Sequence, residues 1–196
     1  GDLENHTKVS RLVDLNNGMI SAKAQSSEDA VVIDGALMTH SLSPMYRLLI
    51  LGAGDVAKFV AEMAIALEYD VMLCDPRPNY LDNWTVPGVE TTAQLPDDVV
   101  RERFSNPYSG IIALAHDPRV DDMALMEALK TNAFYIGAMG SVRTSAARRE
   151  RLPELGLSSD EIDRLHAPIG FQINSKTPAE IAIAVMAEIT SVRYQQ

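Results

Sequence analysis

The sequence predicts an α/β protein: a doubly wound, Rossmann-like parallel sheet with a short N-terminal extension, part of which is expected to form a β-hairpin. Three observations support this prediction. An apolar run at 46–51 is followed by a glycine-rich turn and then by an amphipathic helical pattern over 56–67. A second apolar run at 70–74 ends in an acid, and strand and helix patterns alternate through the rest of the chain. Because such alternation implies right-handed crossovers, we expect the strands to be parallel.

The N-terminal extension is expected to comprise residues 1–45. The apolar side chains at 9, 12, 13 and 15 indicate one side of a short helix, which Asn16-Asn17-Gly18 would end. Asp34-Gly35 stands between two apolar stretches and is a two-residue hairpin signal. Residues 41–44 are expected to be a linker to a Rossmann-like domain over 46–196.

The later elements follow from the same patterns. Thr177 precedes Pro178 at the first position of an expected helix, which is a common way for helices to begin. We expect strands at 89–93, 110–114 and 133–136, helices at 96–104 and 120–130, a basic helix after residue 141, and two helices that begin with capping-box spacing at 158–161 and 177–180.

The turn Gly52-Ala53-Gly54-Asp55-Val56 is the candidate dinucleotide site. Gly52 would allow a tight turn, Gly54 would let the backbone approach a pyrophosphate, and the following helix would supply N–H groups and a positive dipole. Asp75, 21 residues after Gly54, would accept hydrogen bonds from a ribose. The alternative is a Rossmann-like domain that has lost its nucleotide, and Asp55 favours it because an acid beside the phosphate position opposes a second anion.

Two further candidates follow neighbouring strands. Arg77 either holds a ribose 2′-phosphate or pairs with Asp75 or another nearby acid. His116 follows the fourth strand and is the candidate for acid–base catalysis, since histidine titrates near neutral pH. The alternative for His116 is a turn histidine, because Asp117-Pro118 is an ordinary turn signal.

A second candidate anion site follows the fifth strand. Gly140, Ser141 and Arg143 begin a helix there, where free N–H groups and a guanidinium would suit a phosphate. The alternative is that Arg143 only pairs with a carboxylate. The arginines that follow at 148, 149 and 151 are expected to form a solvated face paired with the acids at 150 and 154. Elsewhere, we expect His166 to be structural and Cys74 to pack as a small hydrophobe.

Composition excludes several functions. A formal net charge of −10 argues against a nucleic-acid surface and against docking on anionic membranes. One cysteine allows no internal disulfide and no cysteine-cluster metal site, and the four histidines lack paired ligand spacing, so we expect no bound metal. No run has membrane-spanning length and no leader opens the chain, which predicts a soluble cytoplasmic protein.

As a set, these motifs resemble the carboxyl-terminal, Rossmann-like domain of the XdhC/CoxI family. The resemblance covers about 46–190, and its later motifs are more specific than the glycine turn. It rests on 47–54, Asp75-Pro76-Arg77, His116-Asp117, Tyr135-Ile136-Gly137-Ala138-Met139-Gly140-Ser141-Val142-Arg143, 149–152, His166-Ala167-Pro168-Ile169-Gly170 and 176–182. The resemblance implies an accessory factor for molybdenum hydroxylases of the xanthine dehydrogenase type, which binds molybdenum cofactor, helps its sulfuration and delivers it to the apoenzyme.

The sequence departs from the family pattern at four places. We expect the family's amino-terminal domain, with its Gly-Cys segment, to be missing or reduced to residues 1–45. Asp55 stands where relatives usually have His, and Ala115 stands where they have Thr. Residues 171–174 read Phe-Gln-Ile-Asn instead of Leu-Asp-Ile-Gly. Loss of the amino-terminal cysteine segment would bear on the cofactor's sulfur chemistry, whereas the rest of the chain could still bind a nucleotide or a partner.

The sequence therefore predicts a maturation factor for a molybdenum hydroxylase, expected to be a homodimer, that binds NAD(P), another dinucleotide, or molybdenum cofactor (molybdopterin). In this hypothesis both glycine turns line one cleft, with Arg143 on a phosphate and His116 facing the pterin. One alternative is an NAD(P)-dependent oxidoreductase, with His116 as its acid–base group. The other is a nucleotide-sensing module without chemistry.

Overall fold

The computed structural model describes residues 9–23, 31–42, 44–115 and 117–195, and the chain divides into two compact units, 1–45 and 46–196. Each unit has its own sheet. Within the described ranges, every helix is too short or too polar to cross a membrane.

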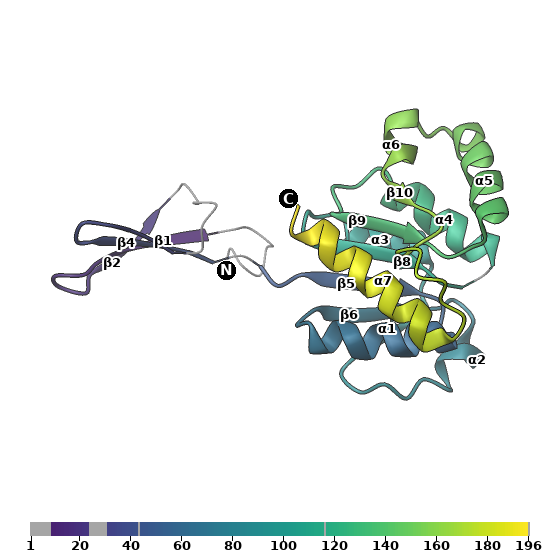
Figure 1. Cartoon of the computed structure of the whole chain (residues 1–196), viewed down its shortest axis with the longest axis horizontal. Helices are drawn as coiled ribbons and strands as arrows, with labels where there is room; N and C mark the ends of the chain where they lie inside the picture. Colours follow the sequence, from purple (N-terminus) through teal and green to yellow (C-terminus); the bar gives the residue numbers. More distant parts are fainter. Residues whose placement is uncertain (1–8, 24–30, 43, 116, 196) are drawn as a thin grey trace. The chain divides into compact units, whose positions relative to one another are not determined.

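The first unit is a four-stranded antiparallel sheet with the strand order β2-β1-β4-β3 (Figure 1). The expected hairpin is present, but its two-residue turn lies one residue later than predicted, at Gly35-Ala36: Asp34 ends β3 and pairs with Leu37, and Gly35 has a φ of +57°. The strands are β1 (Val9–Asp14), β2 (Ile20–Lys23), β3 (Val31–Asp34) and β4 (Leu37–Leu42).

The helix expected near residues 9–15 was wrong, since β1 is a strand. Val13 pairs with Ile20 across a turn in which Gly18 has a φ of +71°, so Asn17-Gly18 turns a hairpin instead of ending a helix. The linker expected at 41–44 was also wrong in part, because β4 extends to Leu42 and pairs there with Val9.

The second unit is a six-stranded sheet with the order β10-β9-β8-β5-β6-β7, in which every pairing is parallel. This is the doubly wound Rossmann order, so the predicted fold class is confirmed. β9 starts two residues later than expected, and the short β10 was not anticipated. The strands are β5 (Arg47–Leu51), β6 (Asp70–Cys74), β7 (Glu90–Thr92), β8 (Ser109–Ala113), β9 (Tyr135–Ala138) and β10 (Leu165–His166).

The helices start largely where the sequence signals place them. Both expected capping boxes are present, at Ser158 with Glu161 and at Thr177 with Glu180. The helices are α1 (Asp55–Ala66), α2 (Pro78–Leu81), α3 (Pro96–Arg103), α4 (Pro118–Ala128), α5 (Val142–Arg151), the 3₁₀ helix η1 (Leu152–Leu155), α6 (Ser159–Asp163) and α7 (Pro178–Arg193).

Side chains of the central strand β5 alternate between two cores. Leu48 and Ile50 pack with α1 and α7 on one face of the sheet, where these two helices lie side by side (Figure 1). Leu49 and Leu51 pack with α3 and α4 on the other face. Cys74 is fully buried in the second of these cores, as expected. The sheet is thus covered on both faces, and its loops emerge where the strands end.

Candidate functional site

The candidate site is the carboxyl edge of the six-stranded sheet, meaning the segments 52–56, 75–77, 114–115, 139–143 and 167–175 that follow its parallel strands. Backbone hydrogen bonds join these segments in sequence across the sheet. They run from Gly52 N–H to the Cys74 carbonyl, from Leu114 N–H to Leu51, from Met139 N–H to Ala113, and from Ile169 N–H to Ala138. The edge is therefore a continuous surface, as is typical of ligand sites in doubly wound folds.

Gly52 is required by the fold itself. Its φ is +97°, a conformation that side chains with a Cβ rarely adopt. A Cβ on Gly52 would lie 2.4 Å from Cα and 2.6 Å from N of Ala115, in the loop after β8. The turn after β5 therefore packs its backbone directly against that loop.

Gly54 has different surroundings. It is the N-cap of α1 with ordinary extended angles, no side chain caps the helix, and a Cβ on Gly54 would meet nothing within 4 Å. The amino end of α1, which carries the positive end of the helix dipole, therefore has no side-chain cap, and the space beside Gly54 is open. Asp55 is 80% exposed and lies 3.8 Å from Lys58 Nζ, so its charge is partly offset. Nucleotide binding at Gly54 and Val56 stays a prediction.

Asp75 is completely buried, and both its oxygens are already engaged. Oδ2 accepts hydrogen bonds from Ala53 N (3.0 Å) and Arg77 Nη2 (2.8 Å), while Oδ1 accepts from Arg77 N (3.0 Å) and Nε (2.8 Å). Burial alone raises the pKa of Asp75, but these hydrogen bonds hold it below its ordinary value. Asp75 is therefore an ionised acceptor that fixes the glycine turn.

Arg77 adopts the second of its two expected roles, the pairing with Asp75. Its guanidinium also lies 3.8 Å from the ring centroid of Tyr80. Since this bidentate pair uses the oxygens that a ribose would need, a ribose could hydrogen-bond to Asp75 only if Arg77 moved away. The roles of Asp75 and Arg77 toward a nucleotide remain predictions.

His116 lies outside the described residues, and its role as an acid–base group stays a prediction. The residue after it starts a helix: Asp117 is the N-cap of α4 and accepts a hydrogen bond from Arg119 N, with Pro118 at the first position. Asp117-Pro118 thus begins a helix, whereas the alternative interpretation of His116 took it as an ordinary turn signal.

The loop after β8 is held by a buried acid that the sequence analysis did not single out. Asp121 of α4 is 1% exposed, and its Oδ1 accepts a hydrogen bond from Ala115 N (3.2 Å). Arg148 Nη2 lies 3.5 Å from Oδ2. Burial raises the pKa of Asp121 to about 6, against the opposing effect of Arg148. Asp121 and Arg148 therefore support the part of the edge that packs on Gly52.

The solvated face expected for the arginines of α5 was wrong for Arg148 and Arg149, whereas Arg151 is exposed. Arg148 is 4% exposed and also donates to Asp122 and to the Met139 carbonyl. Arg149 donates to the carbonyls of residues 162 and 165, and Arg151 pairs with Asp122. These hydrogen bonds and ion pairs fix α5 to the rest of the domain. The long aliphatic part of an arginine can lie along the protein surface while its guanidinium reaches an acceptor on another element.

The second glycine turn is partly occupied by its own side chains. Ser141 Oγ accepts from Thr144 N (3.1 Å), and Thr144 Oγ1 accepts from Ser141 N (3.0 Å), forming a capping box. Two of the N–H groups expected to be free for an anion are therefore used. Arg143 is exposed and makes no hydrogen bond or ion pair with another described residue, so its guanidinium is available to a ligand.

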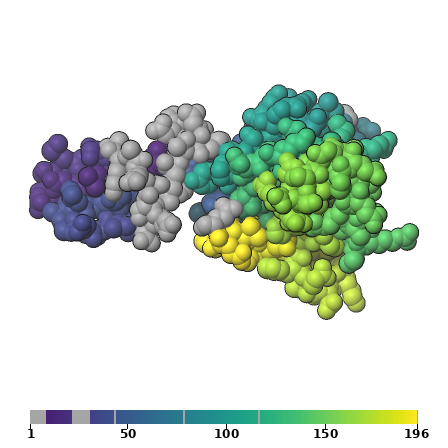
Figure 2. Space-filling view, turned by 90° about the horizontal axis from the view of Figure 1, so that it is seen from above, coloured from purple at the N-terminus to yellow at the C-terminus, as the bar shows by residue number. Residues whose placement is uncertain are grey.

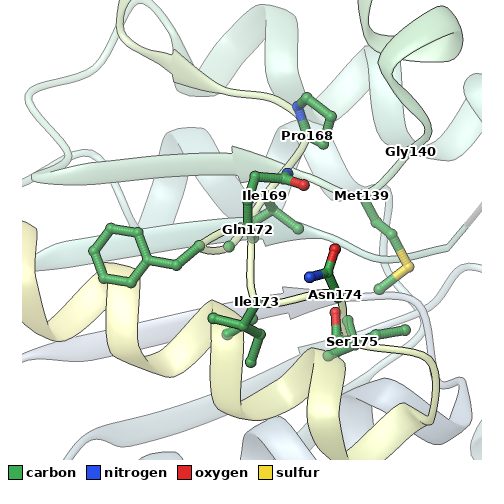
Figure 3. A pocket seen from close by; sticks show the side chains of 12 residues that line it. Met139, Gly140, Pro168, Ile169, Gln172, Ile173, Asn174 and Ser175 are labelled. Carbon is green, nitrogen blue, oxygen red and sulfur yellow. The ribbon is translucent and has the colours of Figure 1, made fainter.

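A pocket of about 220 Å³ opens beside this turn (Figure 3). It is bounded by Met139 and Gly140 after β9, by the segment 168–175, and by Ile181 and Ala184 of α7. In Figure 2 the segments around 140–165 and the chain that follows them lie together on one face of the second unit. Gly140 was predicted to lie at a ligand site, whereas the contribution of 168–175 was not predicted.

The segment 168–175 is anchored through Glu188 of α7. Glu188 Oε2 accepts hydrogen bonds from Gly170 N (2.8 Å) and from the Tyr135 hydroxyl (2.5 Å). Oε1 lies 3.3 Å from His166 Nδ1, and the His166 ring stacks on Tyr135 at 4.6 Å between centroids. His166 thus has the structural surroundings that the sequence analysis expected. Gly170, with a φ of +89°, lets the segment pass closely over α7 near Val185.

The two glycine turns share the carboxyl edge but are separated on it by the loop after β8, because β8 lies between β5 and β9. Gly140 lines the pocket, whereas Gly54 does not. The single cleft expected from the sequence therefore remains a hypothesis about how one ligand would cover both.

Fold and edge together define a Rossmann-type domain with an open glycine turn and a separate pocket. More specifically, the chain belongs to the XdhC family, because residues 48–189 match the model of the XdhC Rossmann domain.

Curated relatives support this assignment. The chain is 31% identical over 153 residues to the molybdenum cofactor insertion chaperone PaoD of Escherichia coli K12, covering 78% of this chain and 42% of that protein. It is 30% identical over 178 residues to the uncharacterized protein YqeB of the same organism, covering 87% and 32%. It is 27% identical over 158 residues to a protein of Bacillus subtilis named as a probable component of xanthine dehydrogenase, covering 80% and 46%. The chain thus spans less than half the length of these relatives.

A solved structure shows the same fold. The crystal structure described as a xanthine dehydrogenase from Bacillus halodurans superposes with a TM-score of 0.76 at 22% identity. The match covers 99% of this chain and 62% of that one.

Proposed function

We propose that the chain is a maturation factor for a molybdenum hydroxylase of the xanthine dehydrogenase type. In this proposal it holds molybdenum cofactor, as cargo, at the carboxyl edge and passes it to the apoenzyme. Membership of the XdhC family supports the proposal, as does the similarity to a protein named as a molybdenum cofactor insertion chaperone.

The observation that most favours a phosphate-bearing cargo is the uncapped amino end of α1. Gly54 leaves open space above the helix terminus, and buried Asp75 fixes the turn through Ala53 N–H. Such a terminus attracts a phosphate through its N–H groups and dipole. Cofactor dinucleotides of molybdopterin carry a pyrophosphate that would suit this position.

The chemistry of the described edge favours binding over catalysis. The two buried acids at the edge are committed to structure: Asp75 pairs with Arg77, and Asp121 binds Ala115 N and pairs with Arg148. What the edge offers a ligand is backbone N–H groups, the Arg143 guanidinium and side-chain amides. These groups make reversible contacts, which a delivery protein needs.

Transfer to an apoenzyme tests the proposal. The purified chain is loaded with molybdenum cofactor, separated from free cofactor and mixed with a cofactor-free hydroxylase, whose activity is then followed. We expect activation by the loaded chain and much less by the same preparation of Gly54→Val, whose side chain would occupy the open space over the helix terminus.

Two results would contradict the proposal. The first is a loaded chain that activates the hydroxylase no better than an equal amount of free cofactor. The second is turnover of NADH or NADPH by the chain alone, which would favour the oxidoreductase instead. Gly54→Val should remain folded, because its backbone angles suit any residue.

A further inference from the structure

We propose that the pocket beside Gly140 receives a neutral, planar heterocycle with an amide-like edge, and that the phosphates of the same ligand lie outside it, toward Arg143. The identity of that ligand as molybdenum cofactor rests on the proposed function, whereas the chemical class follows from the pocket itself.

The charge of the lining is the first argument. All twelve residues that line the pocket are non-ionisable, in a chain with a formal net charge of −10. A phosphate or carboxylate buried here would lack the cation that such groups require. The occupant is therefore uncharged.

The size of the pocket is the second argument. Its volume of about 220 Å³ is below the roughly 300–1,000 Å³ of pockets that enclose whole drug-sized ligands. A complete dinucleotide would not fit, but one ring system of it would.

Two side-chain amides are the third argument. In Figure 3 the amides of Gln172 and Asn174 point into the space that Met139 borders. Neither side chain hydrogen-bonds to another described residue, so each keeps an acceptor oxygen and two N–H donors for a ligand. The edge of a pterin or nucleobase presents complementary donors and acceptors. The thioether of Met139 adds a contact that suits an aromatic ring.

The pocket is also held in place before any ligand binds. The segment that supplies both amides is fixed at Gly170 by Glu188 and at Phe171 by its N–H bond to the Ala184 carbonyl (3.2 Å). Asn174 itself has a φ of +58°, which asparagine tolerates better than most residues. A preformed site loses less free energy on binding than a flexible one.

The chain path places a cation next to this neutral pocket. Met139 and Gly140 line the pocket, and Arg143 follows within the first turn of α5, exposed and unpaired among the described residues. A ligand with a neutral ring and a phosphate tail would therefore find a suitable group for each end.

Isosteric charge variants test the assignment. Gln172→Glu and Asn174→Asp keep the shape of the amides but replace their donors with a negative charge, and both side chains are exposed enough to be changed without unfolding. Gln195→Glu is the matched control, because it adds the same charge near the far end of α7, about 24 Å along a 16-residue helix.

The probes are free pterin, guanosine and cytidine, titrated by calorimetry, with inorganic pyrophosphate as a separate arm. We expect at least one heterocycle to bind, with about tenfold weaker affinity in each pocket variant, the usual effect of one lost hydrogen bond. The control should stay within twofold, and Arg143→Ala should weaken the binding of pyrophosphate. The heterocycle that binds most tightly shows whether the pocket takes the pterin or the nucleobase.

The outcomes separate this proposal from the proposed function. Absence of heterocycle binding, or binding that the pocket variants leave unchanged, overturns the pocket assignment even if cofactor delivery is observed. Heterocycle binding that depends on the pocket amides, without any delivery, supports the assignment and contradicts the maturation role. Emission of Trp84, the one tryptophan in the chain, verifies that each variant is folded.

Discussion

The same substitution should destabilise the protein far more at Gly52 than at Gly54, the two glycines of the first turn. In Gly52→Ala, the new residue would have a left-handed backbone, which costs about 1–2 kcal/mol for an L-residue. Its Cβ would also overlap the main chain of Ala115, which no side-chain rotation can relieve. Asp121 holds that loop by its bond to Ala115 N, so a further cost of about 1–3 kcal/mol is expected for overpacking.

We therefore expect Gly52→Ala to lower the free energy of unfolding by about 2–5 kcal/mol. Gly54→Ala should cost under about 1 kcal/mol, since only the N-cap preference of glycine over alanine is lost. Urea denaturation followed by Trp84 fluorescence measures both, because Trp84 packs against the core of the second unit. A Gly52→Ala variant as stable as Gly54→Ala would refute the idea that the loop after β8 is fixed against this turn.

Three further predictions concern buried titratable groups. Arg148→Met should lower the free energy of unfolding by about 3–5 kcal/mol at pH 7, because it leaves the buried Asp121 carboxylate without its cation. The loss should be smaller at pH 5, since burial raises the pKa of Asp121 to about 6 and the carboxyl then takes up a proton. Urea titrations at both pH values measure the difference. Burial by itself would raise the pKa of Glu188, but hydrogen bonds from His166, Tyr135 and Gly170 hold that pKa below its ordinary value. The stability that Glu188 contributes is therefore present above about pH 4.5 and is lost as the pH falls. Glu188→Ala should accordingly make the melting temperature depend less on pH between about pH 6 and 3. Burial, and secondarily Asp75, raises the pKa of Cys74 to about 12, so a thiol reagent at pH 8 should modify it in urea but not in the native protein; rapid native modification would contradict its burial.

Elements with local signals could be predicted from the sequence. The strand expected at 70–74 matches β6 at both ends, because an apolar run lies between a helix end and an acid. The capping boxes at 158–161 and 177–180 also matched, since both partners of each box lie within three residues. The glycine turn was located for the same reason.

Elements that depend on distant partners could not be predicted in this way. β1 was expected to be helical because the spacing of its apolar residues is compatible with a helix as well as with a strand. Its strand conformation depends on pairing with β4, whose residues lie about 28 positions further along the chain. Arg148 was placed in solvent because its partner Asp121 is on another helix. Likewise, the amides of the pocket became recognisable only when the segment 168–175 was seen over α7 beside Gly140. Gly170 was a local signal in that segment, because a glycine can mark a place where the backbone passes close to another element, as it does here over α7.

Identification of the small molecule that the chain retains tests the central claim most directly. The chain would be produced in a bacterium that makes molybdenum cofactor, purified without added ligand and analysed by native mass spectrometry. The maturation role predicts a bound mass equal to molybdopterin or one of its dinucleotides, and loss of that mass in Gly54→Val. A bound NAD, NADP or flavin in its place, or a wild-type chain that carries no pterin while cofactor is abundant in the same cells, would contradict it.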